Sequence, residues 1–359
     1  MSQPVLYLAI TNHGFGHAVR VASIAGQIKK IHPEIVLVLV TTAPRWLLES
    51  YIEGDFIHRE KSFDVGVIQS DSLNMDLSAT KEKMEYYRSI ESELIANEVE
   101  FIHSHQVSLI VADIPAMVTK IAQKSGIPCW MMSNFGWNFI YSAWGQEFQS
   151  IVDWLSDGYN RCDRLFRLPF AEPMTSFPSQ ENVGLTGVTP RYSEEKLRKQ
   201  YRITTPKEKT VLLTFGGLGL TAIPYENINR FPDWQFITFA NNAPQIPNLL
   251  KISDNQLRPV DFIPVCGKVV SKPGFSTFAE TLRLETPLIS LTRDGFAEAQ
   301  ILLDGLQNHS YHRIVNYQDF FDGDWSFLSQ DLIAPLSTKK IDKYGTEFIA
   351  QEIINKLKG

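Results

Sequence analysis

Two histidines in a glycine-rich loop near the N-terminus are the residues best suited to proton transfer. His13 and His17 lie in residues 11–17, Thr-Asn-His-Gly-Phe-Gly-His, which follow the apolar residues 5–10 and precede an amphipathic stretch. This order predicts a strand, a loop and a helix. The helix dipole disfavours an imidazolium at the N-terminus of the helix, so a neutral imidazole placed there can act as a base.

A carboxylate that could orient this base follows another predicted strand. Asp113 comes directly after the apolar residues 109–112. Because parallel strands end at the same edge of a sheet, we expect Asp113 beside His17, as a candidate catalytic dyad with His13 nearby. The alternative is that His17 only satisfies backbone donors in the first turn and that Asp113 caps a helix beginning at Pro115.

A second constellation joins a later strand to a helix. Residues 271–280 read Ser-Lys-Pro-Gly-Phe-Ser-Thr-Phe-Ala-Glu. Gly274 allows close backbone approach, and free amides near Ser276 or Thr277 at the helix start suit a pyrophosphate. Glu280 lies one turn into the helix, where its carboxylate could accept both hydroxyls of a ribose. Its alternative role is a capping box with Thr277.

Further residues at the ends of predicted strands complete the expected donor site. Gly216 and Gly217 follow an apolar run, and with Lys272 they are expected to contact a diphosphate. Glu298 and Gln300 follow the next predicted strand and are expected to hydrogen-bond sugar hydroxyls. A solvated helix start would explain these last two residues nearly as well.

Three other chemistries are not favoured by the residues. A dinucleotide fingerprint lacks its third glycine, where Val19 stands, and the predicted strand 35–40 is not followed by the acidic residue that holds the ribose of NAD. No Walker-type phosphate loop is present. Residues 322–324 are the one Asp-x-Asp match and are interpreted as a turn, so neither a metal nor a cofactor is expected.

Strands alternating with helices in both halves of the chain must position these residues. The pattern predicts an α/β fold of two Rossmann-like domains whose parallel sheets face a cleft. We expect a first domain over residues 1–170, a proline- and glycine-rich linker over 171–192 and a second domain over 193–340. Residues 341–359 predict a helix, which is expected to pack back on the first domain.

Composition narrows the class of partner. The formal net charge of -6 argues against a nucleic-acid-binding protein, which would carry a basic face. The three cysteines, Cys129, Cys162 and Cys266, are odd in number and far apart, which is not the pattern of a disulfide framework or a zinc site. No secretion signal and no membrane-spanning stretch is apparent. A cytoplasmic protein without stable membrane insertion is expected.

The order of these motifs resembles that of glycosyltransferases of the B fold. More closely, the chain is similar to the transferase-like N-terminal region of L-arabinokinases and to its stand-alone bacterial relatives. The motifs that carry this likeness are His13-Gly14-Phe15-Gly16-His17-Ala18-x-Arg20, Ser133-Asn134-Phe135-Gly136-Trp137-Asn138-Phe139-Ile140-Tyr141 and Phe215-Gly216-Gly217. A weaker likeness is to the transferase that adds N-acetylglucosamine to the peptidoglycan precursor, whose ribose-binding glutamate would fall on Glu280.

The resemblance implies a nucleotide-sugar donor, expected to be a UDP-sugar, held by the second domain and an acceptor held by the first. Residues on the acceptor side would be Gly14, Gly16, Asn134 and Trp137. His17 would deprotonate the acceptor hydroxyl, with inversion at the sugar and no metal. The paired glutamines of the peptidoglycan enzyme are replaced by Glu298-Ala299-Gln300, so the donor sugar is not indicated.

Two other functions share this fold. One is a sugar-nucleotide epimerase or hydrolase, and the other is a non-catalytic nucleotide-sugar-binding protein. A sugar kinase is not expected, because no kinase domain follows the matching region. The sequence indicates neither the acceptor, which could be a small molecule or a lipid, nor the oligomeric state.

Overall fold

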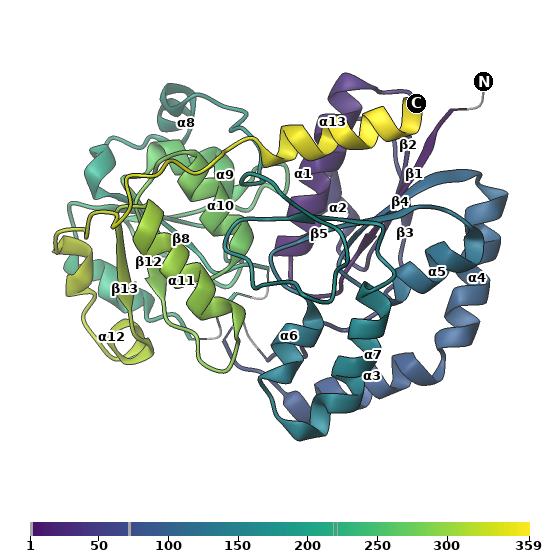
Figure 1. The fold of residues 1–359 in the computed structure, drawn as a ribbon. Coiled ribbons are helices and arrows are strands. Elements are labelled where there is room, and N and C mark those ends of the chain that lie inside the picture. The colour runs from purple at the N-terminus through teal and green to yellow at the C-terminus, as the bar shows by residue number, and fades with distance from the viewer. Residues whose placement is uncertain (1–2, 71–72, 218, 221) are drawn as a thin grey trace.

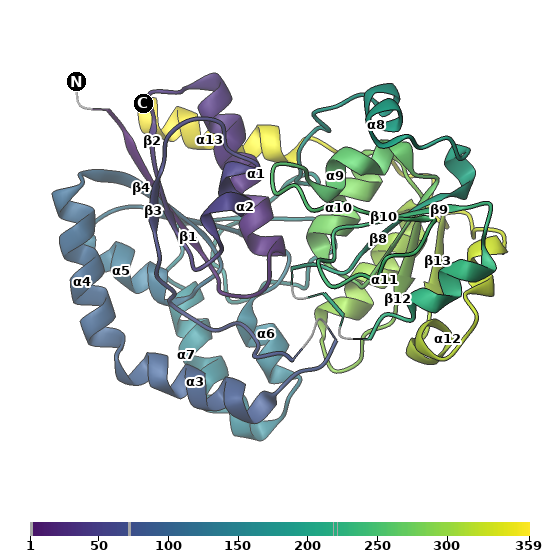
Figure 2. The ribbon, with the colours of Figure 1, turned by 180° about the vertical axis from the view of Figure 1, so that it is seen from behind.

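The computed structural model describes residues 3–70, 73–217, 219–220 and 222–359, and these form two α/β domains that lie side by side (Figure 1). The first domain contains the purple and blue segments, and the second contains the green ones. The first described residues, which lead into the N-terminal strand, and the C-terminus both lie at the first domain, which Figure 2 shows from behind. The predicted fold class is confirmed.

The first domain is built on a parallel sheet with the strand order β3-β2-β1-β4-β5-β6-β7. Its strands are β1 (Val5–Ile10), β2 (Val36–Val40), β3 (Ile57–Arg59), β4 (Val107–Asp113), β5 (Cys129–Ser133), β6 (Arg164–Arg167) and β7 (Gln180–Asn182). Its helices are α1 (Gly16–Ile31), α2 (Arg45–Glu49), α3 (Leu77–Ser89), α4 (Glu91–Ser104), α5 (Met117–Ser125), α6 (Trp137–Ser142) and α7 (Gln149–Tyr159).

The continuous apolar run of β1 is explained by burial on both faces of this sheet. Leu6 and Leu8 belong to one hydrophobic cluster, which includes residues of α1. Tyr7 and Ala9 belong to another, which includes residues of α5 and α7. A strand covered by helices on both faces has no solvent side and therefore shows no polar alternation.

The second domain repeats this plan with a parallel sheet of order β10-β9-β8-β11-β12-β13. Its strands are β8 (Thr210–Thr214), β9 (Gln235–Thr238), β10 (Leu249–Lys251), β11 (Lys268–Ser271), β12 (Leu288–Leu291) and β13 (His312–Val315). Its helices are α8 (Glu194–Tyr201), α9 (Pro259–Phe262), α10 (Phe275–Arg283), α11 (Glu298–His309) and α12 (Tyr317–Phe321).

Both sheets place their functional loops at the point where the strand order reverses. In the first sheet β1 lies between β2 and β4, and in the second β8 lies between β9 and β11. Ligands of open α/β sheets bind beyond the carboxyl ends of the strands at such a switch point. The loops after β1, β4, β8 and β11 therefore converge on the space between the domains.

The segments outside the two sheets differ partly from the sequence prediction. The closing helix α13 (Gly345–Lys358) packs beside α1 of the first domain (Figure 1), and Arg164 of β6 contacts Glu352 at 2.7 Å. The segment predicted as the linker, residues 171–192, contains β7, which extends the first sheet. Its residues, Gln180–Asn182, are all polar and gave no strand signal.

Candidate active site

His17 lies in the first turn of α1, and its side chain faces the end of β4. The Nδ1 atom of His17 is 2.9 Å from Oδ1 of Asp113. His17 is 7% exposed and Asp113 is fully buried. Gly14 turns the preceding loop with a φ of +58°, a left-handed conformation that favours glycine. The structure thus brings the two members of the predicted dyad together.

Helix capping does not account for these two side chains. The N-cap of α1 is Phe15 and that of α5 is Ala116, and in the described residues neither helix start receives a side-chain cap. Asp113 instead receives hydrogen bonds from within the site. A helix-capping role for His17 and Asp113 is therefore not what the structure shows.

Asp113 also determines which nitrogen of His17 carries the proton. Burial disfavours the charged carboxylate, but the positive charge of Arg20 and the contacts with His17 outweigh it and hold the pKa of Asp113 below its usual value. An ionised carboxylate can only accept hydrogen bonds, so Nδ1 of His17 donates in the shorter of its two contacts, 2.9 Å to Asp113, rather than accepting from Nη2 of Arg20 at 3.1 Å. The Nε2 atom then has a free lone pair, as a general base requires.

Arg20 was not predicted as a site residue, yet it is central to this cluster. Its Nε and Nη2 atoms donate to the two oxygens of Asp113 at 2.7 and 2.6 Å, the two-pronged geometry that fixes a carboxylate in place. Arg20 is 3% exposed. Residues three apart on a helix share a face, so its spacing from His17 was the signal that could have revealed it.

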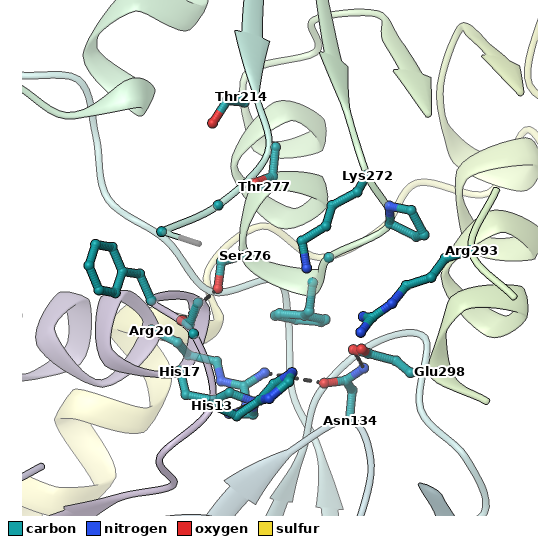
Figure 3. Close-up of a pocket in the computed structure, with 18 of the residues that line it drawn as sticks. His13, His17, Arg20, Asn134, Thr214, Lys272, Ser276, Thr277, Arg293 and Glu298 are labelled. Carbon is teal, nitrogen blue, oxygen red and sulfur yellow. Dashed lines mark hydrogen bonds between the residues drawn. The ribbon is translucent and has the colours of Figure 1, made fainter. Parts of the chain in front are cut away.

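A chain of hydrogen bonds extends from this cluster into the second domain (Figure 3). Arg20 Nη1 donates to Oδ1 of Asn134 at 3.2 Å, and Asn134 Nδ2 donates to Oε1 of Glu298 at 2.7 Å. Glu298 is the first residue of α11 and is buried. The candidate base and the predicted donor-sugar residue Glu298 are therefore linked through the side chain of Asn134.

His13 lies beside His17, with 6.1 Å between the ring centroids. Its Nδ1 atom accepts a hydrogen bond from the backbone N–H of Val67 at 3.3 Å. Burial, together with the charges of His17, Arg293 and Lys272, lowers the pKa of His13 well below its usual value. His13 is therefore a neutral ring that presents an Nε2–H donor, which suits it to hold a substrate oxygen rather than to accept a proton.

Aromatic rings support both histidines from within the first domain. Trp137 is fully buried and donates from Nε1 to Oγ1 of Thr11 at 2.9 Å. Its ring centroid lies 5.1 Å from that of His13 and 6.1 Å from that of His17. Trp137, predicted on the acceptor side, thus packs behind the histidines and is not among the residues that line the adjoining cavity.

A cavity of about 100 Å³ lies between the domains in front of His17. Gly14, Gly16 and Asn134 line it on the side of the first domain. Lys272 and Arg293 face them from the second domain (Figure 3). Burial and the charge of Arg293 lower the pKa of Lys272 to about 7. This wall is built to receive negative charge, and Arg293 at the end of β12 was not predicted as part of it.

The start of α10 forms the next part of this wall. Its N-cap is Gly274, and within the described residues no side chain caps the helix, so the capping box of Thr277 with Glu280 is wrong. The first backbone N–H groups remain available for an anion. Ser276 donates to the carbonyl oxygen of Gly16 at 2.8 Å and thereby joins the two domains.

A second cavity, of about 480 Å³, adjoins the first. The residues that line both are Phe15, Gly16, Thr214, Gly216, Gly217, Ser276 and Thr277. Glu280 lines only the second cavity, is 6% exposed, and its Oε1 has no hydrogen-bond partner among the described residues. Burial raises the pKa of Glu280 to about 8. Such an orphaned carboxyl group is poised for a ligand with hydroxyl donors.

Gln300 lies apart from the other predicted residues. Its side chain is exposed and donates to Oδ1 of Asp304 at 2.7 Å, one turn further along α11. It lines neither cavity. The sequence could place Gln300 near the right strand, but the phase of the helix, which depends on where α11 begins, turns its side chain away.

Comparison with known proteins places this geometry in context. No protein-family model matches the chain. A curated relative, L-arabinokinase from Arabidopsis thaliana, is 28% identical over 331 residues, which cover 88% of this chain. The chain spans 31% of the length of that protein. The predicted likeness to L-arabinokinases is confirmed.

Solved structures decide the fold. UGT71G1 from Medicago truncatula, solved with UDP-glucose, superposes with a TM-score of 0.63 at 12% identity, covering 100% of this chain and 99% of that one. The chain has the glycosyltransferase-B fold. UGT89C1 from Arabidopsis thaliana matches with a TM-score of 0.64 at 14% identity, covering 99% of each chain. A UDP-glucosyltransferase from Polygonum tinctorium matches with a TM-score of 0.63 at 12% identity, covering 100% of each chain.

The described residues contain no group of three or more His, Cys, Asp or Glu side chains that could hold a metal ion. None of their helices has the length and apolar character needed to cross a membrane.

Proposed function

We propose that the chain is a glycosyltransferase that moves a sugar from a nucleoside-diphosphate donor, a UDP-sugar, to an acceptor hydroxyl with inversion. The observation that carries the proposal is the pairing of His17 with Asp113 directly opposite the cationic wall of Lys272 and the α10 N-terminus. One side of the cavity can accept a proton, and the other can accept a leaving diphosphate.

The reaction follows from this arrangement. His17 Nε2 removes the proton of the acceptor hydroxyl, and the oxygen attacks the anomeric carbon from the face opposite the diphosphate. A new C–O bond forms as the bond to the diphosphate breaks, so the sugar configuration inverts. General base assistance contributes about 100- to 10,000-fold. Asp113 keeps the imidazole in the required tautomer and stabilises the imidazolium that forms.

The leaving diphosphate requires compensation of its negative charge. Lys272 and the free N–H groups at the start of α10 supply positive charge without a metal, and Gly216 and Gly217 allow close backbone approach. Glu280 is assigned to the ribose hydroxyls and Glu298 to the donor sugar. His13 is assigned to the acceptor oxygen. The curated relative's kinase activity is not part of this proposal.

The proposal is tested by mass spectrometry of reactions containing a panel of nucleotide-sugars and a panel of hydroxyl-bearing acceptors, with and without EDTA. A glycosylated product that requires the acceptor and survives EDTA is the expected result. Free UDP with epimerised or hydrolysed sugar in the absence of an acceptor would instead identify an epimerase or hydrolase. Saturable donor binding without any product would identify a binding protein.

A further inference from the structure

The larger cavity is enclosed by both domains, although the predicted nucleotide site belongs to the second domain alone. The first domain contributes Phe15, Trp46 and Tyr51 to its wall. The second domain contributes apolar residues such as Phe239 together with polar ones such as Asn241. An apolar space with a few polar groups is typical of sites for small molecules and cofactors.

Trp46 is the residue of this wall that can offer a ring face to a ligand. It lies on α2 and is 37% exposed. Its ring meets the edge of Phe15, with centroids 5.8 Å apart and an angle of 79° between the planes. A Cβ atom at Gly217 would collide with the Phe15 ring, so glycine at that position lets Phe15 reach the second domain and support Trp46.

The polar groups of the two cavities follow the order of the parts of a nucleotide. Lys272 and the α10 N-terminus lie on the first cavity, while Gly216 and Gly217 lie on both. The unpartnered oxygen of Glu280 lies within the second. A diphosphate held where the cavities join and a ribose at Glu280 leave the nucleobase in the remaining space, which Trp46 borders.

We propose that the nucleobase of the donor is held between the domains, with Trp46 of the first domain stacking on it. This inference rests on the proposed function. Nucleotide affinity then depends on a residue outside the nucleotide-binding domain. Base–aromatic stacking contributes enough that its removal weakens binding by roughly 5- to 150-fold. Each base presents an aromatic face, so stacking contributes affinity without selecting the base.

The test is isothermal titration calorimetry of the full chain with UDP and, separately, with inorganic pyrophosphate, which has no base. Trp46→Ala should weaken UDP binding by roughly 5- to 150-fold and leave pyrophosphate binding unchanged. Trp46→Phe, which retains a ring, should lose less. Tyr86→Ala is the matched control, because Tyr86 is an aromatic residue of the same domain, is 50% exposed and lines neither cavity.

Three results would overturn the inference. UDP affinity of Trp46→Ala within twofold of the wild type would show that the ring does not stack on the base. An equal loss for UDP and pyrophosphate would show that Trp46 acts on the phosphate end or on domain closure. Absence of UDP binding by the wild type would overturn the proposed function as well, and this result is distinguishable because no variant is needed to observe it.

Discussion

Replacing the buried Glu280 by glutamine should make the protein more stable and its nucleotide binding weaker. Burial raises the pKa of Glu280 from 4.5 to about 8, because Oε1 lies in a low-dielectric cavity wall without a partner among the described residues. When folding raises the pKa of an acid, the folded state is most stable below the unfolded pKa, where the group is protonated in both states. The free energy of unfolding then falls as the pH rises from the unfolded pKa through the folded pKa.

The size of the stability change follows from the difference between the unfolded and folded pKa values of Glu280. Each pH unit between 4.5 and 8 costs the folded state ~1.4 kcal/mol, so the wild type loses ~1 kcal/mol at pH 5, ~3 at pH 7 and nearly ~5 at pH 9. Glutamine has the same shape and does not titrate. The difference in free energy of unfolding between Glu280→Gln and the wild type should therefore grow by ~4 kcal/mol from pH 5 to pH 9.

Urea unfolding followed by tryptophan fluorescence at pH 5, 7 and 9 measures this difference. Glu82→Gln is the control, because Glu82 is exposed on α3 and should show no such growth. At pH 9, where the wild-type carboxyl group is ionised, the same Glu280 variant should bind UDP roughly 10- to 100-fold more weakly, since hydrogen bonds to a charged group are stronger than those to a neutral amide. A pH-independent stability difference together with unchanged UDP affinity would refute the reasoning.

Three further outcomes are expected. Lys272 has a pKa of about 7, which a bound diphosphate should raise, so the ratio of wild-type to Lys272→Met affinity for a UDP-sugar should be largest below pH 7 and shrink toward pH 9 in calorimetric titrations. Asp113→Asn should lower kcat by about 10,000-fold by misorienting His17, as steady-state rates would show. It should also reduce stability by ~3 to 5 kcal/mol by leaving buried Arg20 without its anionic partner, as urea midpoints would show. Gly217→Ala should displace Phe15 and cost ~1 to 3 kcal/mol of stability, measurable as a lower urea midpoint.

How much of the fold was predictable depended on how each strand is buried. The runs of β1, β8 and β11 were located from their apolar residues, because strands covered on both faces carry a strong signal. The strands β3, β7 and β10 are three residues long, lie at sheet edges and are partly or, in β7, wholly polar, so tertiary pairing creates them rather than local preference.

The residues of the candidate site also divide into those that the sequence predicts and those that only the folded chain reveals. The sheet topology sufficed to bring Asp113 to His17, because Asp113 ends β4 and His17 lies in the loop-to-helix segment after the neighbouring parallel strand β1. Arg20 and Arg293 were missed as site residues, since arginine on a helix or loop is usually solvated. The spacing of Arg20 from His17 was a signal for the first, whereas only the folded geometry places Arg293 at the cavity. Gln300 was assigned to the site wrongly, because the direction in which its side chain leaves the helix depends on the residue at which α11 begins.

The central claim, that His17 is the base of a sugar transfer, is tested most directly by measuring transfer and UDP affinity together in His17→Ala. The account predicts that acceptor-dependent transfer falls by at least about 100-fold while UDP affinity stays within about twofold of the wild type, because His17 faces the acceptor and not the nucleotide. Full transfer activity in His17→Ala would contradict it.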